Sequence, residues 1–396
     1  MVALFKASSA CYIQSQHTTS TKRRRTHDVV RIRPPPPPRS SPLRIAEDMA
    51  SKLGLEITIA DLERLFRQAP GGHPPPPAAD AGDHGGRPPV RVAYQGGRGS
   101  YCQEAAAKAF PPSSSWQQPP ALIIPCSEME EAFAALEDGA ADRAVVPAEN
   151  SVDGPVPRNL DLLLRHPRVC IVGELVLPVN HCLLSLPHAP RSALRRVVSH
   201  PQAISHCRDR LRALHLQVEE VASAADAARF VAENRIADTA VIGSQIAAHE
   251  FGLRVLENNF QDLAGNFNRF LQLGLAGSTG AVVSEPNLDD NDNNNHKTTV
   301  AFSLERGVSD LFRAMWIFES RGVRVARVDH RPNRSKPVRV EEREEAGEIA
   351  RFDYVFVLDL DGNASDTNVE AALARLKEIA GFARVLGSYT CTSSLA

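Results

Sequence analysis

The sequence lacks three features that would place a protein in a class at once. Its 396 residues contain no apolar run near the ~18–20 residues that a membrane-spanning helix needs. Its formal net charge of −2 gives no bulk attraction to nucleic acid or to an anionic membrane surface. Its seven cysteines are scattered without a CxxC pair, which indicates reduced, mostly buried thiols of an intracellular protein. We therefore expect no membrane and no nucleic-acid partner.

Acidic residues are almost absent from residues 1–46, where Asp28 is the only acid among nine Lys and Arg. An Arg- and Ser-rich, acid-poor start is typical of an organelle transit peptide, although a disordered basic tail has the same composition. Residues 47–89 then combine a short amphipathic helix, predicted over Ile57–Gln68, with a Pro- and Gly-rich linker. We exclude residues 1–46 from the fold, whereas two alternatives stay open for the helix at 57–68: it packs on the main body, or it is a spacer.

Polar residues follow the first predicted strands. Gln95 opens a glycine loop between a strand at 90–94 and a helix at 101–110, where free backbone amides attract an anion or simply form a tight turn. Asn150 and Ser151 come just after a short buried strand at 141–147. Residues at such strand ends are placed where ligands bind in open α/β sheets.

The chain then repeats itself. Phe133 to Val146 is echoed by Phe230 to Ile242, each with a helix followed by Ala-Asp-x-Ala-Val. Two similar β–α lobes, joined by a crossing strand predicted over Val169–Leu184, would leave a cleft that suits a small ligand. The polar stretch at 261–270 and Ser199 also lie at predicted strand ends. The spacing of His200, His206 and Cys207 matches no known metal pattern, so we predict no metal site.

A second linker, at 276–297, is rich in Asp and Asn and precedes a compact unit at 298–390. The order of predicted elements in that unit is βαββαβ, which indicates a small ferredoxin-like sandwich. Such a sheet leaves an exposed face or edge, and it often pairs with a copy of itself. The sequence therefore predicts a two-lobed region at 90–275 followed by a separate C-terminal domain.

Several motifs in this order resemble the plant arogenate/prephenate dehydratases, over about residues 88–390. The motifs are Ala93-Tyr94-Gln95-Gly96, Val146-Pro147 with Glu149-Asn150-Ser151, Gly173-Glu174, Ser199-His200-Pro201-Gln202-Ala203, Gln261-Asp262, Asn266 with Arg269-Phe270, Arg331-Pro332 and Arg384 to Tyr389. The resemblance implies an α/β fold: a two-lobed, periplasmic-binding-protein-like catalytic domain followed by a ferredoxin-like (βαββαβ) ACT domain. It also implies a chloroplast (stroma) location and a homodimer or tetramer.

The resemblance implies a reaction as well. Arogenate or prephenate loses carbon dioxide and water, without a cofactor, and becomes phenylalanine or phenylpyruvate. The site must protonate the leaving hydroxyl and orient the carboxylates. The planar guanidinium of Arg269 suits a carboxylate. The expected substrate-binding residues around it are Gln95, Asn150, Ser151, Ser199 and Phe270.

The chain also departs from the family pattern near the expected site. Asn268 stands where the family has a threonine thought to assist the leaving hydroxyl, and an amide is a poor proton source. His206 replaces a glutamine, and histidine can act as an acid near neutral pH. Asp153 replaces a glycine. We therefore assign Asn268, Arg269 and His206 as the catalytic residues, with His206 as a compensating acid.

The C-terminal domain departs as well, in the two segments that the family uses to bind phenylalanine as an effector. The expected effector-binding residues are Ser309, Leu311, His330, Arg331 and Pro332. Added volume and charge there predict weakened feedback. Two other classes of function are open: a catalytically impaired homologue that senses amino acids or regulates active relatives, and a solute receptor. The receptor is disfavoured because the sequence has no secretory signal.

Overall fold

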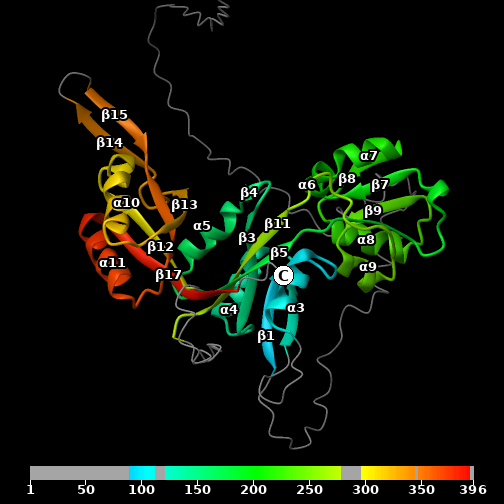
Figure 1. Ribbon diagram of the computed structural model, residues 1–396, viewed down its shortest axis with the longest axis horizontal. Coiled ribbons are helices and arrows are strands. Elements are labelled where there is room, and N and C mark those ends of the chain that lie inside the picture. The colour runs from blue at the N-terminus through cyan, green and yellow to red at the C-terminus, as the bar shows by residue number, and fades with distance from the viewer. Residues whose placement is uncertain (1–88, 112–120, 278–295, 344–346, 393–396) are drawn as a thin grey trace, which may run out of the picture. The chain divides into compact units, whose positions relative to one another are not determined.

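The computed structural model describes residues 89–111, 121–277, 296–343 and 347–392 (Figure 1). The chain separates into two compact units, 1–72 and 73–396, and every described residue belongs to the second. The predicted leader at 1–46, the helix at 57–68 and nearly all of the two linkers lie outside the described residues. In the part that the structure describes, no helix is long and apolar enough to cross a membrane.

The first lobe contains a sheet with the strand order β2-β1-β3-β11-β5. Its strands are β1 (Val90–Gln95), β2 (Ala121–Cys126), β3 (Arg143–Asn150), β5 (Val169–Pro178) and β11 (Phe267–Leu275), and a short β4 (Gly154–Pro155) pairs with β3. β1 runs parallel to β2 and β3, whereas β11 runs antiparallel to β3 and β5. The lobe's helices are α3 (Tyr101–Ala109), α4 (Met129–Glu137) and α5 (Pro157–Arg165). β3 therefore lies inside the sheet, which explains its almost continuous apolar sequence.

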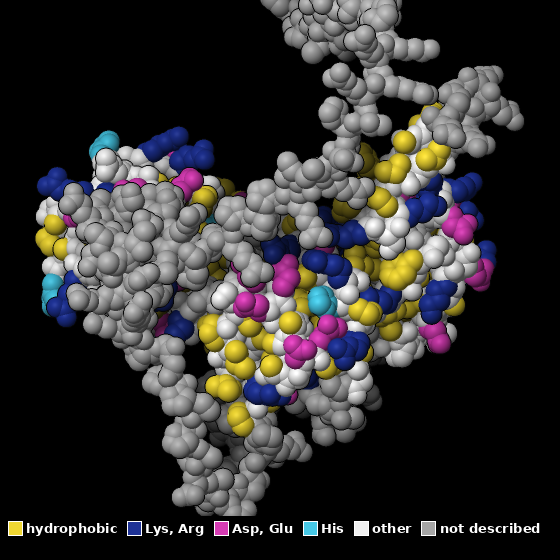
Figure 2. Space-filling view, turned by 180° about the vertical axis from the view of Figure 1, so that it is seen from behind, with side chains coloured by type: hydrophobic (Ala, Val, Ile, Leu, Met, Phe, Trp, Pro, Cys, Tyr) yellow, Lys and Arg dark blue, Asp and Glu magenta, His cyan; other side chains and the backbone are white. Residues whose placement is uncertain are grey.

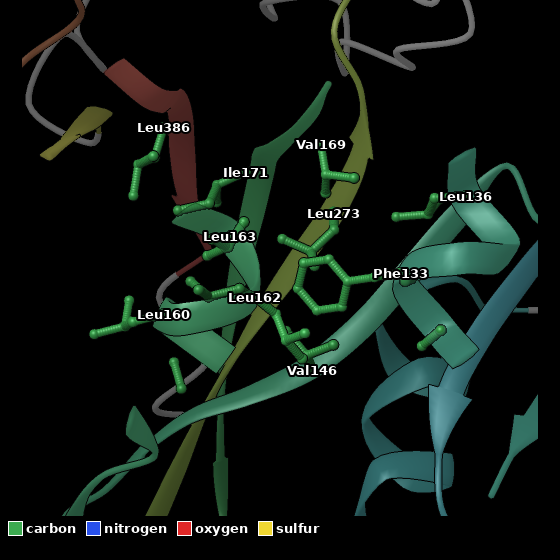
Figure 3. Packing of buried hydrophobic residues seen from close by; sticks show 14 of the residues in the cluster. Phe133, Leu136, Val146, Leu160, Leu162, Leu163, Val169, Ile171, Leu273 and Leu386 are labelled. Atoms are coloured by element: carbon green, nitrogen blue, oxygen red, sulfur yellow. The ribbon is translucent and has the colours of Figure 1, made fainter. Parts of the chain in front are cut away.

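The core of this lobe lies between the sheet and helices α4 and α5 (Figure 3). Phe133 from α4 and Leu162 and Leu163 from α5 are fully buried there against Val146 and Leu273 of the sheet. Each such side chain contributes about 1.5–3 kcal/mol on burial. This packing holds β3 and β11 rigidly side by side, and both strands carry residues of the candidate site.

The second lobe is a five-stranded sheet with the order β10-β6-β9-β7-β8. Its strands are β6 (Cys182–Ser185), β7 (Arg196–Ser199), β8 (Gln217–Glu220), β9 (Thr239–Gly243) and β10 (Arg254–Glu257). Its helices are α6 (Pro201–His206), α7 (Arg208–Leu214), α8 (Ala224–Glu233) and α9 (Gln245–Phe251), and η1 (Arg191–Ala193) is a single 3₁₀ turn. The predicted repeat is confirmed: α4 leads into β3, which pairs parallel with β1, and α8 leads into β9, which pairs parallel with β7.

The chain crosses between the lobes twice, at 179–181 and at 258–266. The single crossing strand predicted over Val169–Leu184 was wrong, because β5 ends at Pro178 and β6 begins only at Cys182. The two crossing segments hold each other through backbone hydrogen bonds, from Val179 N to Asn266 O (2.8 Å) and from Phe260 N to His181 O (2.7 Å). The residues of these segments therefore lie between the lobes.

The C-terminal domain has the predicted βαββαβ order, and its strand order β13-β16-β12-β17 is that of a ferredoxin-like sandwich. Its elements are β12 (His296–Leu304), η2 (Gly307–Asp310), α10 (Leu311–Glu319), β13 (Val325–Pro332), β16 (Tyr354–Asp361), α11 (Thr367–Ile379) and β17 (Ala380–Thr392). A hairpin of β14 (Val338–Arg343) and β15 (Gly347–Phe352), which was not predicted, is inserted between β13 and β16.

Figure 2 shows one face of the molecule, with Lys and Arg side chains interspersed with Asp and Glu. Neither sign of charge dominates this face.

β17 joins this domain to the first lobe. It continues past the predicted end at Leu386 and pairs in parallel with β5, with Gly387 opposite Ile171 and Cys391 opposite Glu174. A side chain at Gly387 would collide with the backbone carbonyl of Ile171, so glycine is required for this close approach. The two sheets thus form one continuous ten-stranded sheet.

Candidate functional site

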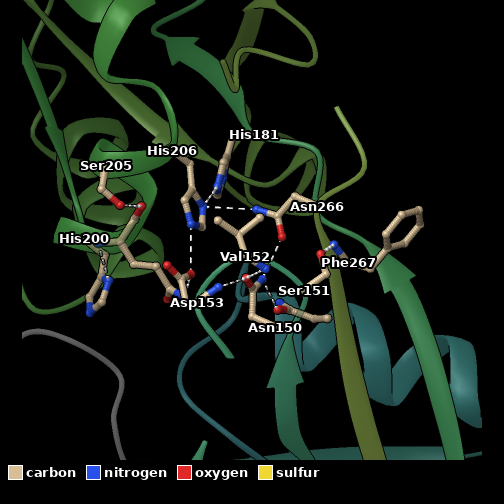
Figure 4. Close-up of polar contacts among 12 residues, drawn as sticks. Asn150, Ser151, Val152, Asp153, His181, His200, Ser205, His206, Asn266 and Phe267 are labelled. Atoms are coloured by element: carbon tan, nitrogen blue, oxygen red, sulfur yellow. Dashed lines mark hydrogen bonds and ion pairs between the residues drawn. The ribbon is translucent and has the colours of Figure 1, made fainter. Parts of the chain in front are cut away.

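Three asparagine amides form the centre of the candidate site, where the crossing segments reach the first lobe (Figure 4). Asn150 ends β3, Asn266 immediately precedes β11, and Asn268 lies opposite Asn150 in the strand register. Asn150 Nδ2 donates to Asn266 Oδ1 at 2.7 Å and to Asn268 Oδ1 at 2.8 Å. The structure therefore brings the predicted residues Asn150 and Asn268 together.

The amide of Asn150 is held in one orientation. Its Oδ1 accepts hydrogen bonds from Val152 N (2.8 Å) and Asp153 N (2.9 Å), so both of its amide hydrogens and both lone pairs are used. This arrangement makes the oxygen of Asn268 an acceptor and leaves Asn268 Nδ2 as a donor. No other described residue accepts from that Nδ2, so it is available to a ligand.

His206 brings the second lobe to this cluster. Its imidazole is 8% exposed, and Nε2 lies 2.9 Å from Asp153 Oδ2 in the first lobe. Its Nδ1 lies 3.1 Å from Asn266 Nδ2, and Gln202 Nε2 also donates to Asp153 Oδ2 at 2.5 Å. His206 and Asp153 are two of the departures from the family pattern, and the structure shows that they contact each other. A single polar contact between the lobes thus accounts for both substitutions.

Ser151 ties the end of β3 to the segment that precedes β11. Its hydroxyl donates to Gly265 O (3.2 Å) and accepts from Phe267 N (2.9 Å). These bonds hold the segment that precedes β11 against the end of β3. The structure therefore places Ser151 next to the asparagine cluster, with its hydroxyl occupied by backbone groups.

A surface hollow of about 580 Å³ opens on the outer side of Asp153. Asp153 lines it from the first lobe, and the second lobe contributes His200, Pro201, Gln202, Ser205, Arg208 and Glu220. Arg208 forms no ion pair with any described residue, so its charge is available to an anionic ligand. Among the described residues, no group of three His, Cys, Asp or Glu side chains is arranged to hold a metal ion.

The structure does not bring Arg269 into the cleft. Because successive side chains of a strand point to opposite faces, Asn268 faces Asn150 and Arg269 faces the C-terminal domain. Its guanidinium is 13% exposed and lies 2.8 Å from both Glu174 and Asp359, and it also donates to Tyr389 at 3.2 Å. The expectation that Arg269 binds a substrate carboxylate is corrected: its guanidinium is occupied by a buried ion-pair cluster between the two domains.

Three further predicted positions lie outside the cluster. Phe270 is 1% exposed and packs in the core of the first lobe, so its expected contact with substrate is corrected. Ser199 is fully buried, and its hydroxyl donates to Ile242 O at 2.6 Å inside the second sheet, so its expected role in the cleft is corrected too. Gln95 ends β1 half-buried, and no hydrogen bond between described residues ties its side chain to Asn150.

The predicted effector residues are placed on two elements. Ser309 is exposed in η2, and the half-buried Leu311 begins α10 and packs on the domain core. His330 and Pro332 are exposed on β13, and the ring of His330 stands against Tyr354 with centroids 5.3 Å apart. Arg331 instead forms a two-pronged ion pair with Asp161 of α5, at 2.7 and 3.0 Å. The structure thus assigns Arg331 to the joint between the domains.

His181 is the site residue that sequence reasoning missed. It is 3% exposed in the first crossing segment, and its Nε2 lies 3.1 Å from His206 Nδ1. Tyr101 contacts its Nδ1 at 2.8 Å, and Gln261 Oε1 accepts from its backbone N–H at 3.0 Å. A histidine directly before the apolar run Cys182-Leu183-Leu184 was the available signal, because buried polar groups need partners.

The comparisons with known proteins agree with this geometry. Residues 92–277 match the family model described as prephenate dehydratase. The chain is 41% identical to "Arogenate dehydratase/prephenate dehydratase 6, chloroplastic" of Arabidopsis thaliana, over 76% of this chain and 68% of the relative. It is 39% identical to "Arogenate dehydratase 2" of Petunia hybrida, over 78% and 73%. A solved prephenate dehydratase from Arthrobacter aurescens, in complex with L-Phe, is 28% identical with a TM-score of 0.62, over 76% of this chain and 90% of that one. This chain belongs to the arogenate dehydratase/prephenate dehydratase family.

Proposed function

We propose that this chain catalyses the decarboxylating dehydration of arogenate, prephenate or both, as a step in phenylalanine synthesis. The observation that carries the proposal is the polar cluster between the lobes, in which Asn150, Asn268 and His206 lie within one hydrogen-bonded network. The family membership of the chain supports the same reaction. No observation favours the alternative of a silent regulatory homologue.

The proposed chemistry uses three properties of the site. The substrate loses its ring carboxylate as carbon dioxide, and the electron pair left behind expels hydroxide from the ring. His206 donates the proton that converts hydroxide to water, and Asn268 Nδ2 holds the leaving oxygen. Arg208, at the edge of the hollow, attracts a substrate carboxylate in place of the occupied Arg269. Formation of the aromatic ring supplies the driving force, so the proposed reaction needs no cofactor.

Turnover of the full chain on arogenate and on prephenate, measured side by side, tests the proposal. Release of phenylalanine from the first substrate or of phenylpyruvate from the second is the expected result, and the ratio of kcat/KM values defines the preference. A matched variant, His206→Ala, reports contamination by other dehydratases because it removes the proposed acid. Absence of both products from a folded protein would favour the regulatory alternative.

Restoring the family's threonine tests the role of Asn268. We expect Asn268→Thr to raise kcat by about tenfold, because a hydroxyl at this position adds a second proton donor to the one that His206 supplies. The measurement is kcat on the better substrate, and Asn268→Val, which has the shape of threonine without its hydroxyl, is the control. A kcat that Asn268→Thr leaves unchanged would assign proton transfer to His206 alone.

We propose that the C-terminal domain binds phenylalanine weakly. The related structure from Arthrobacter aurescens contains L-Phe. Here, however, Arg331 is occupied by Asp161, and Asp310 is paired with Arg306 at 2.6 Å and Arg313 at 3.2 Å. The hydrogen bond from Arg306 lowers the pKa of Asp310 to about 2, so a fixed charge lies beside the expected effector turn.

Feedback by phenylalanine is therefore expected to be shallow. Initial rates should fall less than about twofold as phenylalanine rises to millimolar concentrations, because the guanidinium and the turn are already occupied. The measurement is an inhibition curve with tyrosine as the control amino acid. Half-inhibition by micromolar phenylalanine would show that the substituted turn still accepts the effector.

We propose a homodimer formed through the C-terminal domain, with a tetramer of two such dimers as the alternative. Val308, Phe312 and Trp316 are 56%, 77% and 60% exposed on η2 and α10, and such an apolar face is costly to leave in water. We expect Phe312→Glu with Trp316→Glu to convert a dimer to a monomer in sedimentation velocity at micromolar concentration. A wild-type chain that sediments as a monomer at that concentration would refute the proposal.

We also propose that residues 1–46 direct the chain to the chloroplast stroma. Their basic, acid-poor composition supports this, as do the relatives that are named chloroplastic. The proposed domain organisation continues with a helix and linker at 47–89, the catalytic domain at 90–275, a linker at 276–297 and the ACT domain at 298–390. A fusion of residues 1–46 to a fluorescent protein tests this targeting, and fluorescence in the cytosol would contradict it.

A further inference from the structure

Two histidines contact each other between the lobes, and the proposed function uses only one of them (Figure 4). His181 lies in the crossing segment between β5 and β6, and His206 ends α6. Their rings are 5.4 Å apart between centroids, tilted by 33°, with His181 Nε2 and His206 Nδ1 at 3.1 Å. At that distance one nitrogen carries a proton and the other accepts it.

The contact between Asp153 and His206 fixes where the protons of the two histidines lie. A carboxylate only accepts, so His206 Nε2 carries the proton that faces Asp153. Asn266 Oδ1 accepts from Asn150, so Asn266 presents its Nδ2 hydrogens to His206 Nδ1. His206 Nδ1 is therefore an acceptor when the ring is neutral. His181 Nε2 then carries a proton, and its Nδ1 accepts from the hydroxyl of Tyr101 at 2.8 Å.

The Tyr101 hydroxyl permits a second arrangement. Its oxygen lies 3.4 Å from Asn180 O as well as 2.8 Å from His181 Nδ1. When the hydroxyl donates to Asn180 O, its lone pair is free to accept a hydrogen bond from a protonated His181 Nδ1. His181 Nε2 then has a lone pair that faces His206, so His206 Nδ1 can hold a second proton, and the histidine pair as a whole takes up this one proton from solvent. The cost is the hydrogen bond from Asn266 Nδ2, which loses its acceptor.

We propose that His181 is a positioning residue that changes tautomer and thereby lets His206 become the cationic acid of the dehydration. This inference rests on the proposed function. His206 Nε2–H breaks as the proton forms a bond to the leaving hydroxide, which takes the place of Asp153 as acceptor. The ring C–O bond breaks with its electron pair on oxygen, and water leaves. His206 remains neutral with its proton on Nδ1, bonded to His181 Nε2, and solvent returns a proton to Nε2.

The surrounding groups are consistent with this role. Burial lowers the pKa of His181 to about 4, so His181 stays neutral while it changes tautomer. Burial raises the pKa of Tyr101 well above its usual value and that of Cys207 to about 12, so neither group ionises near neutral pH. Asp153, Arg208 and Glu220 are the charged groups that line the hollow beside α6, and the carboxylate of Asp262 caps the first turn of α7. Asp153 is thus the only carboxylate among the described residues that pairs with His206.

The first experiment compares pH profiles of kcat and KM for the full chain, His181→Phe and Tyr101→Phe, from pH 5 to 9. We expect His181→Phe to lower kcat about 10- to 100-fold with little change in KM, because general acid catalysis is lost. The fall of kcat at high pH should move to lower pH by about one unit. Tyr101→Phe, which keeps the ring in place, should shift the profile in the same direction by a smaller amount. Parallel profiles in all three proteins would overturn the proposal.

A double-mutant cycle separates positioning from packing. In the His206→Gln background, which carries the family's residue, His181→Phe should have almost no further effect on kcat because the group that it serves is gone. An equal fold-loss in both backgrounds would show that His181 acts only through packing. Circular dichroism and the thermal midpoint confirm that each variant is folded.

Nitrogen-15 NMR of labelled histidines tests the tautomers independently of turnover. As His206 titrates, the protonated nitrogen of His181 should change from Nε2 to Nδ1 with the same midpoint. A His181 that keeps one tautomer throughout would overturn the inference, even in an active enzyme. If the unchanged chain turns over neither substrate but the tautomer change is observed, the proposed function fails while the coupled histidine pair stands.

Discussion

Asn150→Asp is expected to lower kcat/KM by about 10²–10³-fold, the usual cost of removing a preorganised donor from an active site. The substitution keeps the shape of the side chain but replaces two N–H donors with a carboxylate oxygen. That oxygen would face Asn266 Oδ1 and Asn268 Oδ1, which lie 2.7 and 2.8 Å from the present Nδ2. Both amides would turn away, and the orientation of His206 Nδ1 depends on the first of them. Steady-state kinetics on arogenate and prephenate measure the effect.

Asn234→Asp is the matched control for this prediction. Asn234 is exposed after α8, and its amide donates only to Phe230 O at 2.9 Å. Its replacement should leave kcat/KM unchanged within about twofold. Asn150→Ala adds a second test, because it removes the donors without adding charge. If Asn150→Asp stays within threefold of the unchanged chain, the asparagine cluster is not the centre of the site.

Arg269→Met is expected to lower the free energy of unfolding by about 3–5 kcal/mol, because it removes from two buried carboxylates the guanidinium that they share. Glu174 and Asp359 are each 3% exposed and both lie 2.8 Å from the guanidinium. Burial alone would raise the pKa of Glu174, but Arg269 and Lys297 hold it below its usual value, so Glu174 is charged at neutral pH. Urea denaturation followed by circular dichroism measures the loss.

Arg229→Met is the control for Arg269→Met, since it removes an exposed ion pair with Asp226 that is worth about 0–1 kcal/mol. The experiment also separates the two interpretations of Arg269. A guanidinium that bound a substrate carboxylate would, when removed, raise KM strongly and leave stability almost unchanged. A guanidinium that joins the domains should reduce stability and weaken hydrogen-exchange protection along β17. A change in the free energy of unfolding under about 1 kcal/mol, together with a large rise in KM, would instead support binding of a substrate carboxylate by Arg269.

Local patterns in the sequence predicted much of the fold. The two lobes were predicted from the repeat of Phe133 to Val146 in Phe230 to Ile242. This was possible because each helix and the strand that follows it are specified by residues close together in the chain. The βαββαβ order of the C-terminal domain is readable for the same reason. The β14–β15 hairpin was missed although Val338 and Val340 alternate with Arg339 and Glu341, a period-two pattern that indicates a strand.

The sequence by itself determined which residue types stand at the ends of strands, and it therefore located Asn150 and Asn268. Only the tertiary structure decided which of their neighbours face the cleft. Asn150 contacts Asn266 and Asn268 across 116 and 118 residues of chain, and these pairings turn Arg269 toward the C-terminal domain. They also bury Phe270 and bring His181 to His206. The physical reason is that a side chain's local conformation depends on near neighbours, whereas the face on which it lies depends on which distant strands pair.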